Sequence, residues 1–280
     1  MRSIRPAVQA GRFYPADPIE LRRTIESFLA AVTVPAGPVP KALIVPHAGF
    51  VYSGPVAAWG YVSLRSGRRT IRRVVLVGPS HHAEFSGLAS SSFEAFATPL
   101  GVVPVETVGG PGVEILDAAH RPEHCLEVQL PFLQVVLDDF VIVPLLVGSA
   151  DDTDVQAVLA RLWGGPETVV VISSDLSHYH DHATATRLDA VTARQIEALE
   201  PEALGSGSAC GRLAIRGLLR EARVRGLHAR TLDLRTSGDT AGPRDRVVGY
   251  GAFAFQAGSE PETAGADRSN DCCNPGNPAG

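Results

Sequence analysis

The feature that most constrains this chain is an apolar run that stops at a pair of histidines. Residues 73–77 read Arg-Val-Val-Leu-Val, and Gly78-Pro79-Ser80 separates them from His81-His82. A run of aliphatic residues without polar alternation is typical of a strand covered on both faces, and a Gly-Pro pair ends such a strand. We therefore expect the two histidines to lie just beyond the carboxyl end of a central strand.

Two further apolar runs end in a similar way. Residues 42–45 lead through Pro46 to His47, and residues 168–172 lead through Ser173-Ser174 to Asp175 and then His178. Helical patterns between the apolar runs predict a single α/β domain whose central sheet, mostly parallel or mixed, is flanked by helices. If the three strands are neighbours, their carboxyl ends bring these polar side chains to one rim, where open α/β sheets bind ligands.

Local signals place most of the remaining elements. Asp17-Pro18 predicts a helix start, because a capping aspartate is followed by proline at the first helical position. Further helices are expected over 53–65, 113–120, 125–137, 151–162, 183–199 and 210–224, and strands over 140–147, 230–235 and 247–255. Segment 85–108 is typical of short strands or a long excursion over the rim. We expect a folded domain over 1–258 and a disordered tail over 259–280, whose composition is too polar to form a core.

Composition and charge argue against several classes of function. The net charge of −5 offers no polyphosphate-binding surface, so nucleic acid is not an expected partner. No apolar run approaches the roughly 20 residues of a membrane span, and the four cysteines form neither a disulfide framework nor a CxxC zinc pattern. These features predict a cytoplasmic protein without a membrane partner. Segment 78–80 lacks the lysine of a phosphate loop, and no GxSxG motif is present.

The histidines that follow the three strands are the first candidates for chemistry. A neutral imidazole is the commonest metal ligand in proteins, and two histidines with one carboxylate form a recurring non-haem iron site. A single histidine after a strand is more often structural. The recurrence at His47, His81 or His82, and His178 favours a metal site.

Two shorter pairings carry weaker signals. Asp175 stands three residues before His178 and can orient its imidazole as a general acid or base; the alternative is a helix cap beside a solvated histidine. His124 and Glu127 have the i, i+3 spacing of one helix face, which can direct both at a site but is also common at helix ends. Both interpretations of each pairing stay open at this level.

Taken together, these motifs resemble the Memo family. The matching segments are 45–54, 78–82, 123–131, 173–178 and 210–212, and the resemblance runs in order from about Pro6 to Phe255. Bacterial and archaeal members are called AmmeMemoRadiSam system protein B. The family is similar in fold to the class III extradiol ring-cleaving dioxygenases, which use non-haem iron(II).

The resemblance implies roles for particular residues. His47 and His81 would bind the metal, and His178, preceded by Asp175, would act as the catalytic acid or base. Animal relatives complete the site with a cysteine, which we align near Thr240. The neighbouring Asp239 would restore a set of two histidines and one carboxylate, so we expect Asp239 rather than Thr240 as third ligand, with Fe(II) favoured and copper the alternative. The residues expected to support the ligands are His82, His124, Glu127 and Tyr52.

The resemblance leaves two functions open. One is a metal-dependent, dioxygenase-like oxidoreductase that acts on a small molecule or peptide, with AMMECR-type and radical-SAM proteins as partners. The other is a module that binds a peptide or protein in a vestigial dioxygenase-like cleft without catalysis. No motif in the sequence identifies a substrate.

Overall fold

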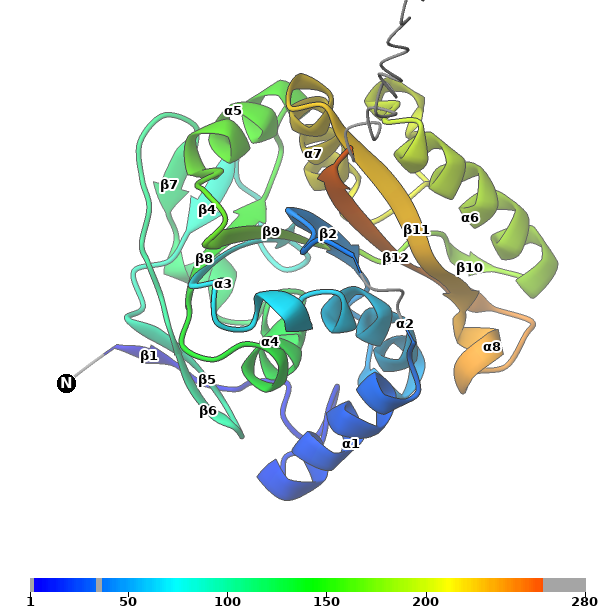
Figure 1. The fold of residues 1–280 in the computed structure, drawn as a ribbon, viewed down its shortest axis with the longest axis horizontal. Helices are drawn as coiled ribbons and strands as arrows, with labels where there is room; N and C mark the ends of the chain where they lie inside the picture. The colour runs from blue at the N-terminus through cyan, green and yellow to red at the C-terminus, as the bar shows by residue number, and fades with distance from the viewer. Residues whose placement is uncertain (1–2, 34–36, 259–280) are drawn as a thin grey trace, which may run out of the picture.

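The central sheet places the three histidine-terminated strands side by side, as the sequence predicts. A computed structural model describes residues 3–33 and 37–258 of the chain; the predicted tail over 259–280 lies outside the described residues. Strands β2 (Ala42–Val45), β9 (Thr168–Ser173), β3 (Arg73–Pro79) and β8 (Val141–Val147) are parallel neighbours in that order. Their carboxyl ends therefore share one edge of the sheet (Figure 1).

The flanks of this sheet are antiparallel, which makes the whole sheet mixed. On one side β12 (Val247–Ala257) runs antiparallel to β2, and both β11 (Leu227–Thr236) and β10 (His178–His180) pair with β12. On the other side β4 (Leu88–Ser90) runs antiparallel to β8, and β7 (Val113–Ile115) pairs with β4. A separate small sheet consists of β1 (Ile4–Arg5), β5 (Ala95–Thr98) and β6 (Gly101–Pro104).

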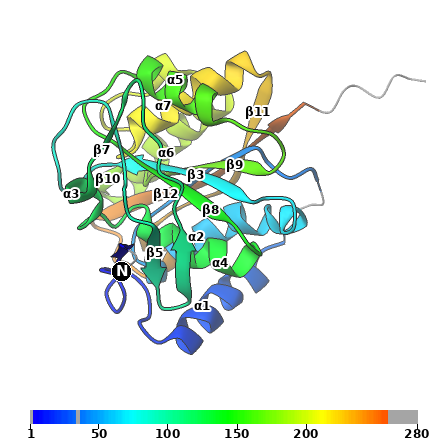
Figure 2. The same ribbon diagram turned by 90° about the vertical axis from the view of Figure 1, so that its left-hand side faces the viewer.

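Helices cover both faces of the central sheet (Figure 2). Because alternate residues of a strand point to opposite faces, Leu43 and Val45 pack under α1 (Pro18–Ala30), α2 (Phe50–Val62) and α4 (Leu130–Val136). Ala42 and Ile44 pack on the opposite face, under α5 (Asp152–Leu162), α6 (His182–Glu197) and α7 (Arg212–Val224). The uninterrupted apolar runs are thus explained by two cores that share one sheet.

Several predicted elements are confirmed and others need correction. Asp17 caps α1 by accepting hydrogen bonds from the amides of Ile19 and Glu20. The predicted helix over 113–120 is wrong: β7 pairs with β4 there, and only the short α3 (Asp117–His120) follows. Helix α2 begins at Phe50, with Gly49 as its N-cap, rather than at Ser53.

The remaining short elements lie in connecting segments. The predicted helix over 125–137 divides into the 3-10 turn η2 (Glu127–Gln129) and α4. The segment between β11 and β12, expected as a loop, contains the short helix α8 (Ser237–Thr240). Two further 3-10 turns are η1 (Arg65–Gly67) and η3 (Pro201–Ala203). No helix in the described part of the chain is both long and apolar enough to cross a membrane.

Candidate metal site

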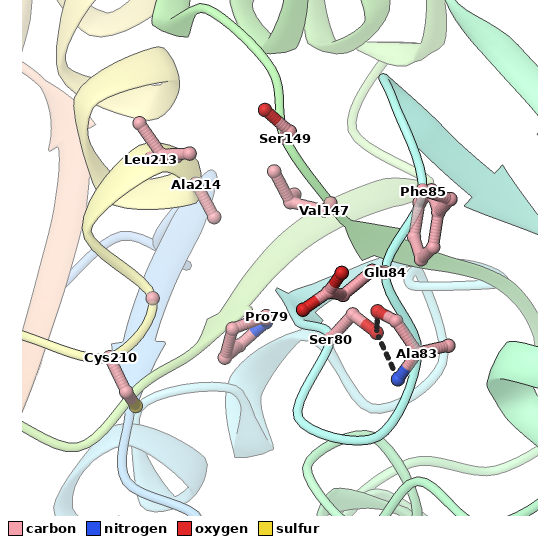
Figure 3. A pocket seen from close by; sticks show the side chains of 12 residues that line it. Pro79, Ser80, Ala83, Glu84, Phe85, Val147, Ser149, Cys210, Leu213 and Ala214 are labelled. Carbon is pink, nitrogen blue, oxygen red and sulfur yellow. Dashed lines mark hydrogen bonds between the residues drawn. The ribbon is translucent and has the colours of Figure 1, made fainter.

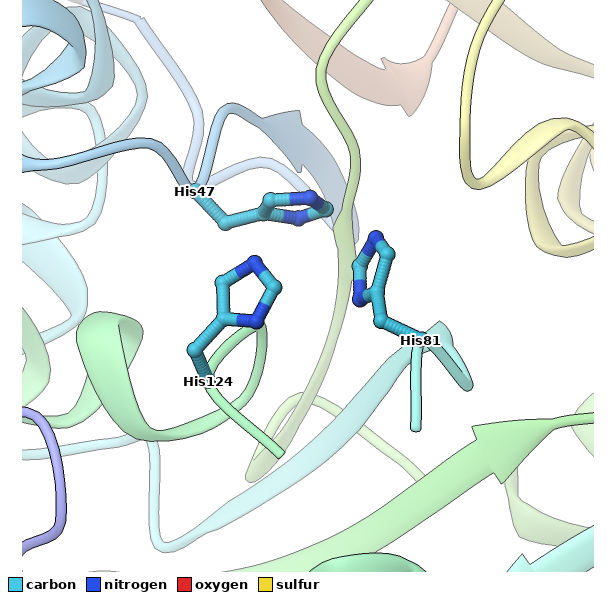
Figure 4. A group of neighbouring side chains, drawn as sticks. All are labelled: His47, His81 and His124. Atoms are coloured by element: carbon cyan, nitrogen blue, oxygen red, sulfur yellow. The ribbon is translucent and has the colours of Figure 1, made fainter. Parts of the chain in front are cut away.

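Three imidazoles from separate parts of the chain meet at the carboxyl edge of the central strands. His47 follows β2, His81 follows β3, and His124 lies in the loop before η2. One ring nitrogen from each lies within 4.8 Å of the other two. The ring centroids are 5.2 Å apart for His47 and His81, and 4.5 Å apart for His81 and His124. Figure 4 shows the three rings turned towards one another, as ligands of a single metal ion would be.

The hydrogen bonds around Ser173 determine which nitrogen of His47 carries the proton. The Ser173 hydroxyl donates to the carbonyl of Cys125 at 2.6 Å and accepts from Gln129 Nε2 at 2.8 Å. Its oxygen, which has one lone pair left, lies 3.0 Å from Nδ1 of His47. Because the single hydroxyl proton is already used, Nδ1 must be the donor. The lone pair of His47 Nε2 is therefore free to bind a metal.

Burial keeps the His47 imidazole neutral. His47 is almost fully buried, and this burial lowers its pKa to about 4. A neutral imidazole is the protonation state that a metal ion requires of its ligand.

Glu123 orients the other two imidazoles from a buried position. Its carboxylate accepts hydrogen bonds from the backbone amide of His81 at 2.7 Å and from His81 Nδ1 at 2.9 Å. It also accepts from the amides of His124 and Cys125, and it lies 3.2 Å from Nδ1 of His124. Although burial acts in the opposite direction, the hydrogen bonds from His124 and His81 hold the pKa of Glu123 well below its usual range. A charged carboxylate on Nδ1 leaves Nε2 of His81 as the free ligand atom, an arrangement common behind metal-binding histidines.

A glycine allows the loop that carries Glu123 and His124 to approach the sheet. A side chain at Gly78 would bring its Cβ within 2.6 Å of Cys125 Sγ. Only glycine leaves enough room for this close contact, because it has no Cβ. Gly78 therefore has two roles: it precedes the proline at the end of β3, and it lets the loop of the site pack against that strand.

Cys210 adds a sulfur atom next to the free nitrogen of His47. Its Sγ lies 3.3 Å from His47 Nε2 and 3.3 Å from the backbone amide nitrogen of Asp175. Burial, followed by the negative charge of Asp175, raises the pKa of the thiol to about 12. A coordinated divalent cation deprotonates a thiol, so this pKa describes the metal-free protein only.

The donor set fits a transition metal ion. Imidazole nitrogen is a ligand for iron, copper, zinc and nickel, and a thiolate adds affinity for the softer of these ions. His47 and His81 present unprotonated Nε2 atoms, and Cys210 stands beside one of them. The hydrogen bonds of Ser173 and Glu123 to the Nδ1 atoms can stay in place when a metal binds, and only the contact between Cys210 Sγ and His47 Nε2 is replaced.

A comparison with known proteins places this chain in a family. A family model described as Memo-like protein matches residues 5–254. The chain belongs to the Memo-like family. A MEMO1 family protein of Aeropyrum pernix is 38% identical over 283 residues, which cover 89% of this chain and 98% of that protein. MEMO1 family proteins of Saccharolobus solfataricus and Thermotoga maritima are each 35% identical, covering 89% and 88% of this chain and 98% and 97% of their own lengths.

In this Memo-like chain, Asp239 does not join the histidine cluster. Its carboxylate accepts from the backbone amide and hydroxyl of Thr236 at the start of α8, and it lies 2.6 Å from Nε2 of His182. Thr240 donates its hydroxyl to the carbonyl of Ser237. Among the described residues Asp239 belongs to none of the groups that could hold a metal, because a capping box and the contact with His182 hold its carboxylate at α8; its role as third ligand stays a prediction. The third side chain of the cluster is instead His124.

Asp175 is near the site but has a different partner from the one expected. It accepts a hydrogen bond at 2.7 Å from the backbone amide of His47, and so positions the residue that follows β2. The Nδ1 atom of His178 instead lies 2.8 Å from the carbonyl oxygen of Leu176, and its ring contacts Tyr179. Among the described residues, no ring contact joins His178 to the three clustered imidazoles. Its role as acid or base stays a prediction.

Of the four residues expected to support the ligands, His124 lies in the cluster and the other three have different positions. His82 is exposed, with its ring centroid 6.0 Å from that of His124, and one of its ring nitrogens lies within 4.8 Å of ligand atoms of Glu123 and His124. Tyr52 is exposed on α2. Glu127 is fully buried in a separate network, where it pairs with Arg5 at 2.6 Å and accepts from Tyr14 at 2.6 Å. It anchors the N-terminal segment rather than the metal site.

Sequence reasoning missed three residues of the site. Glu123 received no role, His124 was expected only as a supporting residue, and Cys210 was noted as a matching motif without a role. Both 123–131 and 210–212 had been recognised as motifs. Their match to the family motifs is the available signal for these residues, but a motif does not show where its side chains lie in space.

Proposed function

We propose that this Memo-like protein binds one transition metal ion at His47, His81 and His124, with Cys210 as an additional ligand. The convergence of three imidazoles, two of which have an unprotonated Nε2, carries the proposal. Fe(II) is the proposed ion. Copper is its competitor, because a thiol ligand favours copper more than a carboxylate ligand does.

We further propose that the metal serves a redox reaction on a small molecule or peptide. When bound, such a metal supplies redox and Lewis-acid chemistry with open positions for a substrate. The chain holds the ligand tautomers through Ser173 and Glu123 and excludes water from behind His47. Asp175, in the segment that follows β9, fixes the backbone of His47 by accepting a hydrogen bond from its amide. Association with AMMECR-type and radical-SAM proteins is proposed from the family resemblance alone.

Metal content tests the first proposal. Protein is purified without oxygen, loaded with Fe(II) or Cu(I), desalted and analysed by mass spectrometry for bound metal. We expect close to one ion per chain in the wild type and a large loss in His47→Ala, His81→Ala and His124→Ala. His228→Ala is the matched control, because its imidazole is exposed on β11 and belongs to none of the candidate metal groups. Equal metal content in His124→Ala and the wild type would refute the proposed ligand set.

Oxygen uptake tests the redox proposal. Metal-loaded protein is mixed with candidate small molecules in an oxygen electrode, and the cluster variants serve as controls. Uptake that depends on both metal and substrate supports the oxidoreductase. A protein that binds metal and a peptide, but consumes no oxygen with any candidate, favours the non-catalytic alternative.

A further inference from the structure

A cavity opens beside the histidine cluster on the side of Cys210. Its volume is about 450 Å³, and it lies between the ends of β3 and β8, the segment after His82, and the start of α7. Figure 3 shows these walls and places Cys210 at one margin of the space. The lining residues are Pro79, Ser80, Ala83, Glu84, Phe85, Val147, Gly148, Ser149, Cys210, Gly211, Leu213 and Ala214. Because Cys210 also contacts His47 Nε2, the cavity adjoins the proposed metal position.

The charge of the cavity comes from a carboxylate. Glu84 is the charged side chain among the described lining residues, and no lysine, arginine or histidine accompanies it in the wall. Figure 3 shows its carboxylate turned towards the space between Pro79 and Val147. No salt bridge joins Glu84 to a cationic side chain in the described part of the chain. Around Glu84, on the side of the cavity away from the proposed metal, an anionic group of a ligand is therefore disfavoured and a cationic one is attracted.

The rest of the lining is mostly apolar. Phe85, Val147 and Leu213 offer side chains that can pack against an apolar ligand body. The hydroxyl of Ser80 is already occupied, because it donates to the carbonyl of Ala83 at 2.7 Å. The volume is at the lower end of the roughly 300–1,000 Å³ found for small-molecule sites. These features suit a compact molecule with one positive group rather than an extended peptide.

We propose that this cavity is the substrate subsite of the metal centre and that it takes a small molecule with a protonated amine and a compact apolar body. The amine pairs with Glu84, and the apolar body packs between Phe85 and Leu213. The remaining end of the molecule faces Cys210 and the metal. That the cavity is a substrate subsite rests on the proposed metal function. The preference of the cavity for a cation rests on Glu84 alone.

Three probes with the same apolar body test the charge preference. Binding of 2-phenylethylamine, 2-phenylethanol and phenylacetate to the metal-loaded protein is measured by ligand-observed NMR titration. We expect the amine to bind about tenfold more tightly than the alcohol, as for one solvent-accessible charge-assisted hydrogen bond. Phenylacetate should bind most weakly to metal-free protein, where no cation is present to bind its carboxylate. Phenylacetate binding to metal-free protein as tightly as the amine, or no binding by any probe, overturns the proposal.

Variants assign the effect to this cavity. Glu84→Gln should bring the amine to the affinity of the alcohol and leave the metal content unchanged. Glu114→Gln is the matched control, since it removes an exposed carboxylate on β7, outside the cavity. Ser149→Phe fills the cavity from an exposed position and should weaken all three probes at least tenfold. Unchanged amine binding in either Glu84→Gln or Ser149→Phe places the amine elsewhere and refutes the subsite.

Failure of this inference can be separated from failure of the metal proposal. The same titrations are repeated on metal-free protein. Binding of the amine that depends on Glu84 in a protein that takes up no metal supports the subsite and refutes the metal function. Full metal content without any Glu84-dependent probe binding refutes the subsite alone.

Discussion

Replacing Glu123 with glutamine tests the tautomer argument at the residue that orients two proposed ligands. The buried carboxylate accepts four hydrogen bonds of 2.7 to 3.1 Å. Two come from the backbone amide and Nδ1 of His81, and two come from the backbone amides of His124 and Cys125. A glutamine of the same shape has a single acceptor oxygen, and its amino group faces N–H donors. If that amino group faces Nδ1 of His81, the ring must place its proton on Nε2, which blocks the metal-binding atom.

The size of the effect follows from the number and kind of these bonds. Hydrogen bonds to a charged group contribute about 1.5–3 kcal/mol, against about 0.5–1.5 kcal/mol for neutral ones. A loss of about 1 kcal/mol at each of four bonds lowers the free energy of unfolding by about 4 kcal/mol. Metal affinity should fall 10- to 100-fold, or about 1.4–2.8 kcal/mol, as for other residues that orient metal ligands.

Chelator competition measures this affinity. Fe(II) is partitioned anaerobically between a chromophoric chelator and the wild-type, Glu123→Gln or Glu114→Gln protein, and thermal unfolding is followed in parallel. Glu114→Gln removes an exposed carboxylate and should match the wild type in both measurements. A folded Glu123→Gln protein whose Kd for Fe(II) is within twofold of the wild-type value would refute the orienting role of the carboxylate.

Three further predictions concern pH, the N-terminal anchor and α8. Burial lowers the pKa of His47 and His120 from about 6.5 to about 4. Between these pH values the unfolded metal-free chain therefore binds more protons than the folded one. The free energy of unfolding should fall by up to about 3 kcal/mol per histidine as the pH is lowered from 6.5 to 4. Urea unfolding should show this fall; a constant midpoint between pH 7 and 4.5 would contradict it. Arg5→Met should cost about 3–5 kcal/mol in the same assay by leaving Glu127 buried and unpaired, and a full-stability variant would refute the anchor. Asp239→Ala should cost about 0.5–2 kcal/mol through the lost cap, with unchanged metal content; loss of the metal would restore Asp239 as a ligand.

The amino-acid sequence alone determined the central sheet and two of the three clustered histidines. Apolar runs without polar alternation marked β2, β3 and β9 as strands buried on both faces, and the structure confirms them as parallel neighbours. Parallel strands end at the same edge of a sheet, so His47 and His81 were expected to meet. This inference needed only local pattern and a general rule of α/β topology.

Only the tertiary structure decided the rest of the site. His124 and Glu123 reach it from a loop that packs against Gly78, and Cys210 reaches it from the turn before α7. Asp239 was expected there because of its place in the sequence, yet a local capping box holds it at α8. Periodicity records whether a segment is buried, but it does not record which distant loop packs against which strand end. That choice depends on long-range packing, so the third imidazole, its orienting carboxylate and the sulfur became visible only in the folded chain.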